Sequence, residues 1–95
     1  MNKNDPDEKV ITIIFHFENG WKCPIATFKR CGLRDVFNLV LVQLGDNDYS
    51  LDLRRTKFVY MAEVISKYFL NNEKVSSLKL KKHSIIEVYR LGNLK

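Results

Sequence analysis

Residues 78–92 read Leu78-Lys79-Leu80-Lys81-Lys82-His83-Ser84-Ile85-Ile86-Glu87-Val88-Tyr89-Arg90-Leu91-Gly92. This stretch begins as a tight polar turn, and its second part, Ser84 to Leu91, is rich in β-branched and aromatic residues. Such residues fit a pleated and packed surface, so we predict a strand there. Because the strand has so few polar positions, we expect it to pair on both sides, in the middle of a sheet.

The N-terminal third of the chain predicts a hairpin. Residues 10–17 are an unbroken run of strand-favouring residues, and alternation would place four of them on one face: Ile11, Ile13, Phe15 and Phe17. Asn19-Gly20 is a strong hairpin signal because both residues accept a positive φ. The returning strand would span residues 21–30. Pro24 cannot donate a ladder hydrogen bond, so we expect this strand at an edge of the sheet, or Pro24 at a bulge.

The middle of the chain predicts one main helix followed by further strands. Residues 32–44 carry the apolar stripe of a helix that lies on a sheet: Leu33, Val36, Phe37, Val40, Leu41 and Leu44. After a loop at residues 46–56, we expect a third strand at 57–65 and a short strand at 68–70. The predicted fold class is therefore α+β, with a mixed sheet of four to five strands packed on one main helix.

Length and composition indicate one domain. The chain has 95 residues, of which 45% are hydrophobic and 28% charged, and this supports a single core. We expect a flexible tail at residues 1–9 with no secretory signal, a domain at 10–92 and a short tail at 93–95. No apolar run is long enough to span a bilayer. Two cysteines, Cys23 and Cys31, are too few for the disulfide framework of a small secreted domain, which favours the reducing cytoplasm or nucleus. We expect two free, buried thiols in preference to the alternative of a Cys23–Cys31 bridge.

Catalytic and metal-binding patterns are weak. His16 and His83 have no further ligand at zinc spacing. Four alternating polar residues resemble the start of a calcium loop: Asp46, Asp48, Ser50 and Asp52. However, Leu51 stands where the loop glycine belongs, and Lys57 stands where the bidentate glutamate belongs. No phosphate-binding glycine loop, acid–base carboxylate pair or base for a cysteine nucleophile is evident. We therefore expect no enzyme activity and no cofactor.

The order of elements, the helix stripe and the final turn and strand resemble ubiquitin-like domains over residues 10–91. This resemblance implies a β-grasp fold, in which the second strand is outermost. Ubiquitin-like proteins that become covalent modifiers end in a Gly-Gly pair, whereas residues 90–95 read Arg-Leu-Gly-Asn-Leu-Lys. The resemblance is therefore closer to the non-conjugated members, which are docking modules for other proteins.

The resemblance also implies a docking surface on the outer face of the sheet, in the third and last strands. Carried over by position, the surface comprises six residues: Lys57, Val59, Met61, Glu87, Tyr89 and Leu91. Alternation agrees, because an inward-facing Ile86 and Val88 would leave Glu87 and Tyr89 pointing outward. Tyr89 differs from the aliphatic residue typical of ubiquitin. An ordinary exposed cross-strand pair of Val59 with Tyr89 explains these residues equally well.

Two alternatives use basic residues, because the chain has a net charge of +5 and a pI of about 9.3. Ras-binding and Ras-associating domains are also β-grasp, and they hold a small GTPase against a basic second strand and helix start. The corresponding residues here are Lys22, Lys29, Arg30 and Arg34. A nucleic-acid site would use Lys79, Lys81, Lys82 and Arg90, but exposed aromatic residues are few beside them, so solvated lysines are the better interpretation. We expect a monomer that binds a protein, with acidic partners favoured by the charge.

Overall fold

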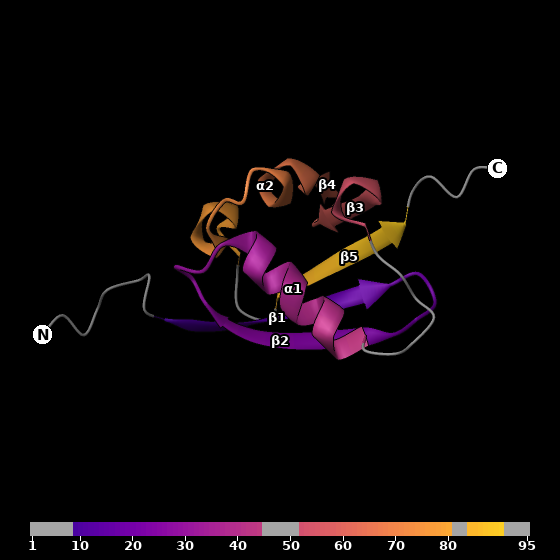
Figure 1. Ribbon diagram of the computed structural model, residues 1–95, viewed down its shortest axis with the longest axis horizontal. Coiled ribbons are helices and arrows are strands. Elements are labelled where there is room, and N and C mark those ends of the chain that lie inside the picture. The colour runs from indigo at the N-terminus through magenta and orange to yellow at the C-terminus, as the bar shows by residue number, and fades with distance from the viewer. Residues whose placement is uncertain (1–8, 45–51, 81–83, 91–95) are drawn as a thin grey trace, which may run out of the picture.

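The computed structural model describes residues 9–44, 52–80 and 84–90 of the chain. Its strands are β1 (Val10–Phe17), β2 (Lys22–Phe28), β3 (Thr56–Tyr60), β4 (Glu63–Val64) and β5 (Ser84–Arg90). Its α-helices are α1 (Leu33–Leu44) and α2 (Ser66–Leu70), and short 3-10 helices lie at Leu53–Arg55 and Val75–Leu78. The helix α1 lies across one face of the sheet, as Figure 1 shows.

The strands form one 5-stranded sheet in the order β2-β1-β5-β3-β4. The central pair β1–β5 is parallel and aligns Phe15 with Ile86, whereas the other neighbouring strands are antiparallel. β5 is thus hydrogen-bonded on both sides, as its sequence predicts. The expected mixed sheet packed on one main helix is confirmed.

The hairpin of β1 and β2 places Pro24 at the open edge of the sheet. The backbone N–H of Phe17 donates to the carbonyl of Trp21 at 2.8 Å, and hydrogen-bonded pairs then recur at every second residue. Pro24 lies opposite Ile14, at a position between those pairs, so its nitrogen faces away from β1. The missing N–H therefore removes no bond from the sheet, and the predicted edge position is confirmed.

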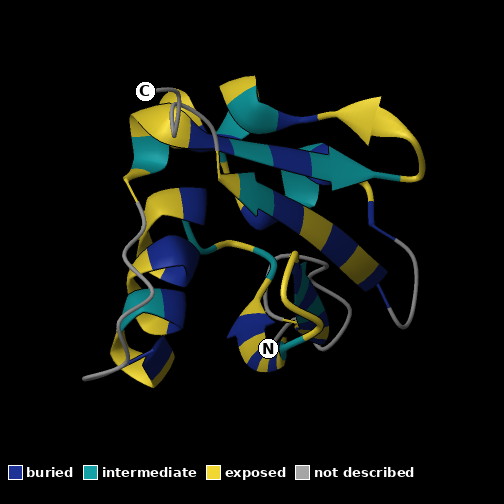
Figure 2. Ribbon diagram, turned by 90° about the vertical axis from the view of Figure 1, so that its right-hand side faces the viewer, coloured by how far each residue is buried: buried dark blue, intermediate teal, exposed yellow. Residues whose placement is uncertain are grey.

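One hydrophobic core lies between α1 and the sheet. The predicted strand face and helix stripe supply most of it, since Ile13, Phe15, Leu33 and Val36 are completely buried. Leu41 is half-buried at the margin of the stripe. Figure 2 shows how buried and exposed residues alternate along the strands, while α1 is buried along one side only. Each strand therefore has one face toward the core and one away from α1.

The predicted single strand at residues 57–65 is wrong, because the chain reverses inside it. β3 ends at Tyr60, Met61 and Ala62 form a turn with φ angles of 50° and 69°, and β4 returns antiparallel with Tyr60 opposite Glu63. Neither turn residue is glycine or asparagine, so the usual sequence signal of such a turn is missing.

The predicted short strand at residues 68–70 is also wrong, because these residues belong to α2. The ring of Phe69 stacks on Phe58 with centroids 3.8 Å apart and planes 8° from parallel. The Ser66 hydroxyl oxygen accepts the backbone N–H of Phe58 at 3.0 Å. These contacts with β3 select a helical turn over the strand that the aromatic residues favour locally. Residues 46–51 of the predicted loop lie outside the described residues.

Candidate functional site

The face of the sheet that α1 leaves uncovered is the candidate site, and we call it the outer sheet face. It is formed by alternate residues of the five strands, since their neighbours in sequence are buried against α1. Among its residues are Ile14, His16, Lys22, Pro24, Lys57, Val59, Val64, Ile85, Glu87 and Tyr89.

A row of side chains crosses this face through every strand. The strand pairings place Lys22 opposite His16, and His16 opposite Glu87. Glu87 in turn lies opposite Val59, and Val59 opposite Val64. Residues directly opposite one another on neighbouring strands have their Cβ atoms about 5 Å apart, so these side chains are neighbours. The row divides the face into an apolar part and a polar part.

The apolar part lies on the side of the row toward the start of β5. There Pro24, Ile14 and Ile85 are aligned across three strands. Ile85 is 45% exposed and Val64, at the end of the row, is 59% exposed. Met61 adjoins this part from the turn after β3 and is 70% exposed. Apolar residues gathered on one face mark a contact surface more strongly than the same residues scattered singly.

The polar part is built around Tyr89. Its hydroxyl donates to Glu87 Oε1 at 3.0 Å, and Lys57, its direct partner on β3, places Nζ 5.4 Å from the ring centroid. The hydrogen bond to Glu87 raises the pKa of Tyr89, and the negative charges of Glu87 and Glu18 raise it further. The phenol is therefore held neutral, as a hydrogen-bond donor, in a negative local field.

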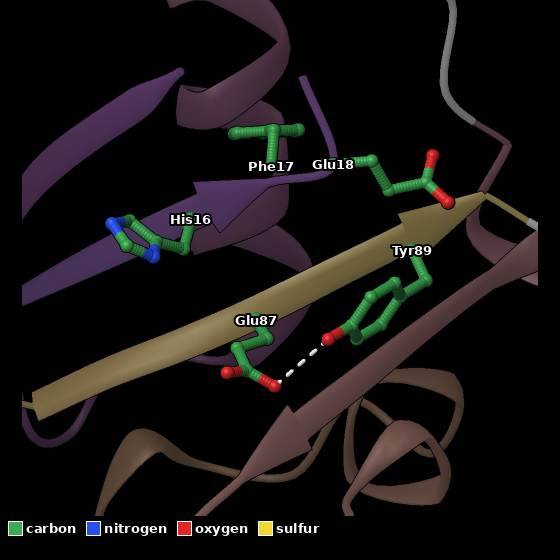
Figure 3. A pocket seen from close by; sticks show the side chains of 5 residues that line it. All are labelled: His16, Phe17, Glu18, Glu87 and Tyr89. Atoms are coloured by element: carbon green, nitrogen blue, oxygen red, sulfur yellow. Dashed lines mark hydrogen bonds between the residues drawn. The ribbon is translucent and has the colours of Figure 1, made fainter. Parts of the chain in front are cut away.

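A hollow of ≈ 180 Å³ opens beside this tyrosine, between the end of β1 and β5. It is lined by His16, Phe17, Glu18, Glu87 and Tyr89. Figure 3 shows Tyr89 directed back toward Glu87, with His16 on the neighbouring strand and Glu18 just beyond the end of β1. Carboxylates, an imidazole and an aromatic ring thus surround one small space.

The structure brings together most of the residues predicted for the docking surface. Lys57, Val59, Glu87 and Tyr89 share the outer sheet face, although Val59 opposes Glu87 and not Tyr89. Met61 stands beside it in the turn after β3. Leu91 lies outside the described residues.

Sequence reasoning did not assign a role to three groups of this face. Alternation puts Ile14 and His16 on the opposite face of the first strand from Ile13 and Phe15, but their alignment with β5 depends on the parallel register of β1 and β5. Glu18, which precedes the Asn19-Gly20 hairpin signal, carries no pattern of its own, although it lines the hollow. Period-two alternation identifies the face of each strand, but it cannot say which strands are neighbours.

The basic residues of the GTPase alternative do not form one cluster. Lys22 begins β2, whereas Lys29 and Arg30 follow its end; strand rise separates the two ends by roughly 20 Å. The Arg30 guanidinium lies over the Phe28 ring, 4.5 Å from its centroid. Arg34 is turned toward α2, where its guanidinium donates to the carbonyls of Phe69 and Leu70.

The described residues of the nucleic-acid alternative lie on different elements. Lys79 ends a 3-10 helix and Arg90 ends β5, whereas Lys81, Lys82 and His83 lie outside the described residues. Cys23 and Cys31 are free thiols; Cys23 is buried, which raises its pKa, and Cys31 is only half-buried.

Residues 9–44, 52–80 and 84–90 contain no group of three or more histidine, cysteine, aspartate or glutamate side chains that could hold a metal ion. No helix in these ranges is long and apolar enough to cross a membrane.

The turn beside the outer sheet face has a testable cost in stability. A two-residue hairpin loop with positive φ at both positions favours Asn-Gly, yet the chain has Met61-Ala62 there. Replacing both, as Met61→Asn with Ala62→Gly, is expected to raise the free energy of unfolding by about 1 kcal/mol. Thermal denaturation should show the midpoint rising by roughly 5 °C.

The control for this change is Met61→Ala, which removes the exposed side chain and keeps a residue that is strained at positive φ. Its midpoint should stay near that of the original chain. Equal midpoints for the double variant and the control would show that this turn is not strained.

Comparisons with known proteins agree on the fold. No protein-family model matches the chain, and no curated protein matches it in sequence. Among solved structures, the chain is similar to the UBL domain of yeast Ddi1, with 15% identity, a TM-score of 0.69 and coverage of 90% of this chain and 94% of that one. It is also similar to the ubiquitin-like domain of an Arabidopsis thaliana protein, with 7% identity, a TM-score of 0.71 and coverage of 100% and 92%.

A third similar structure is a chain of the pParkin-pUb-UbcH7 complex, with 17% identity and a TM-score of 0.62. The match covers 85% of this chain and 23% of that longer one. At these identities the likeness concerns the fold alone, and it agrees with the strand order and the single main helix described above. The chain therefore has the ubiquitin-like β-grasp fold.

Proposed function

We infer that this chain is a non-catalytic protein-interaction module that docks a partner protein through its outer sheet face. The observation that carries the proposal is the division of this face into an exposed apolar part and an adjoining polar part. Protein interfaces commonly combine a central apolar area with a polar rim. Ile85, Val64 and Met61 supply exposed apolar surface here, and Tyr89 is of a residue type enriched at the energetic centres of interfaces.

The fold of the similar structures is compatible with a binding role. A ubiquitin-like fold hosts many functions, so the fold alone does not decide among them. Three titratable groups of the face, Glu87, Tyr89 and Lys57, serve a hydrogen bond and a cation–π contact. These are contacts suited to recognition, and no nucleophile with an adjacent base stands among them.

The free thiols of Cys23 and Cys31 support a cytoplasmic or nuclear location for the module. Pro24 at the open edge of β2 supports a monomer, because an added strand would lack a backbone donor there. The net charge of +5 favours partners whose overall charge is negative, through long-range attraction.

The test is capture of binding proteins by immobilised chain, with two matched double variants. Val59→Ser with Ile85→Ser removes apolar surface from the outer sheet face. Leu39→Ser with Val42→Ser makes the same kind of change on the exposed side of α1, where these residues are 44% and 73% exposed. We expect the outer-face variant to lose the proteins that the original chain and the α1 variant both retain.

Both variants must first show the thermal unfolding midpoint of the original chain within a few degrees. If the outer-face variant folds and still retains the same proteins, the proposed surface is wrong. If the α1 variant alone loses them, the helix is the docking surface. Loss caused only by Lys29→Glu with Arg30→Glu would instead favour the GTPase-type alternative at the end of β2.

A further inference from the structure

The hollow beside Tyr89 has a chemistry of its own within the outer sheet face. Glu18 and Glu87 both line it, from the turn after β1 and from β5. Glu87 accepts a hydrogen bond from the Tyr89 hydroxyl, and no ion pair joins either carboxylate to a lysine or arginine of the described ranges. Two carboxylates that pair with no lysine or arginine of the described ranges therefore line one space of ≈ 180 Å³.

The cations of the outer sheet face flank this space without lining it. Lys57 approaches the Tyr89 ring from β3, and Lys22 lies next to His16 on β2. Neither is among the residues that line the hollow. Figure 3 shows Glu18 just beyond the end of β1 and Glu87 on β5, with the Tyr89 hydroxyl directed at Glu87.

We propose that the hollow is a subsite for one lysine or arginine side chain of the docking partner. The proposal rests on the outer sheet face being the docking surface. A positively charged group would meet Glu18 and Glu87 at once, and the aromatic ring offers a further favourable contact through its electron-rich face. A guanidinium could in addition donate hydrogen bonds to both carboxylates, since its planar N–H donors suit such oxygens.

The small volume and its walls argue for a side chain in preference to a larger group. The hollow opens beside the apolar part formed by Ile14 and Ile85, so a partner segment that covers that part lies within reach of it. A partner with an overall negative charge can still supply one basic residue. Long-range attraction depends on the net charge, whereas this contact depends on the groups within a few ångströms.

The test requires no partner, because isolated side-chain analogues can serve as probes. The amide resonances of the isotope-labelled chain are followed by NMR during titration with Nα-acetyl-arginine methylamide or the lysine counterpart. The citrulline counterpart has nearly the shape of arginine and no charge. We expect saturable shifts at His16, Glu87 and Tyr89 with a cationic probe, and little or no shift with citrulline.

Two matched variants each remove one negative charge. Glu87→Gln alters the hollow, and Glu63→Gln alters an exposed carboxylate of β4 outside it. Glu87→Gln should weaken cation binding by roughly fivefold, the upper end of what one exposed ion pair contributes. Glu63→Gln should leave it unchanged. Glu87 is exposed and the glutamine can still accept the tyrosine hydroxyl, so we expect the variant to fold.

Three results would overturn the subsite: equal shifts with arginine and citrulline probes, equal binding by the Glu87→Gln and original chains, or no saturable shift with either cationic probe. Such a result together with loss of partners by the outer-face variant would reject the subsite and keep the docking surface. Cation binding in the hollow combined with unchanged capture by the outer-face variant would reject the docking surface alone.

Discussion

Replacing Phe58 with alanine is expected to lower the free energy of unfolding by about 4 kcal/mol. Phe58 is 1% exposed and lies at the centre of an aromatic cluster. Its ring stacks on Phe69 at 3.8 Å and meets the edges of Phe37 and Phe15 at centroid distances of 5.8 and 6.5 Å. The substitution removes these contacts and leaves a cavity among residues from β1, β3 and both α-helices, which cannot close without moving them all.

Urea denaturation followed by tryptophan fluorescence would measure this loss. Trp21, the single tryptophan, is half-buried against Phe17 and therefore reports on the core side of β1. The control is Phe28→Ala, because Phe28 is 37% exposed at the end of β2. We expect that variant to lose less than about 1 kcal/mol. Similar losses for both variants would contradict the central role of Phe58.

Arg34→Ala is expected to lower the free energy of unfolding by about 1.5 kcal/mol, although the residue is exposed. Its guanidinium donates to the carbonyls of Phe69 and Leu70 at the end of α2. The last carbonyls of a helix lack partners within the helix, so a cation that donates to them stabilises its end. After the substitution the carbonyl of Phe69 still accepts the backbone N–H of Asn72 at 3.1 Å, and that of Leu70 can turn to solvent, which limits the loss.

The control for this prediction is Arg34→Lys, which keeps the charge but has no planar pair of donors. We expect it to recover less than half of the loss, as measured by urea denaturation. Full recovery by lysine would show that charge alone matters. The same measurement bears on the GTPase alternative, because an Arg34 that holds α2 is less available to an approaching partner.

The parts of the fold that follow local patterns were predictable from the sequence. The apolar residues of β1 recur every two residues and those of α1 every 3.6 residues, because both elements pack one face against the same core. Pro24 indicated the edge strand because a proline nitrogen has no hydrogen to donate to a neighbouring strand. Ile86 and Val88 were expected to face inward, and they are 0% and 1% exposed.

The predictions that were wrong concern elements whose structure depends on contacts between residues distant in sequence. The helix α2 is selected by stacking of Phe69 on Phe58 and by Arg34, which lies 35 residues before Phe69. Nothing in residues 66–70 alone encodes those partners, while their aromatic residues favour a strand locally. The chain reversal after Tyr60 could not be predicted for another reason: Met61-Ala62 contains neither the glycine nor the asparagine that usually marks such a turn.

The predicted site shows the same division. Alternation within β3 and β5 was enough to place Val59, Glu87 and Tyr89 on the outer sheet face. The hollow was not predictable, because it requires the end of β1 to lie beside Glu87. That neighbourhood arises from a parallel pairing of the first and last strands, for which neither strand carries a local signal.

This parallel pairing has a consequence for folding during synthesis on the ribosome. β5 fills the place between β1 and β3, and it is the last strand of the described chain to be synthesised. Until it emerges, β1 has a partner only in β2, and the β3–β4 hairpin is not joined to β1 and β2. A nascent chain that stops before Ser84 thus exposes two unfilled strand edges together with core residues, a state prone to aggregate and attractive to chaperones. The complete native sheet can therefore form only after β5 has been synthesised, when almost the whole domain has been translated.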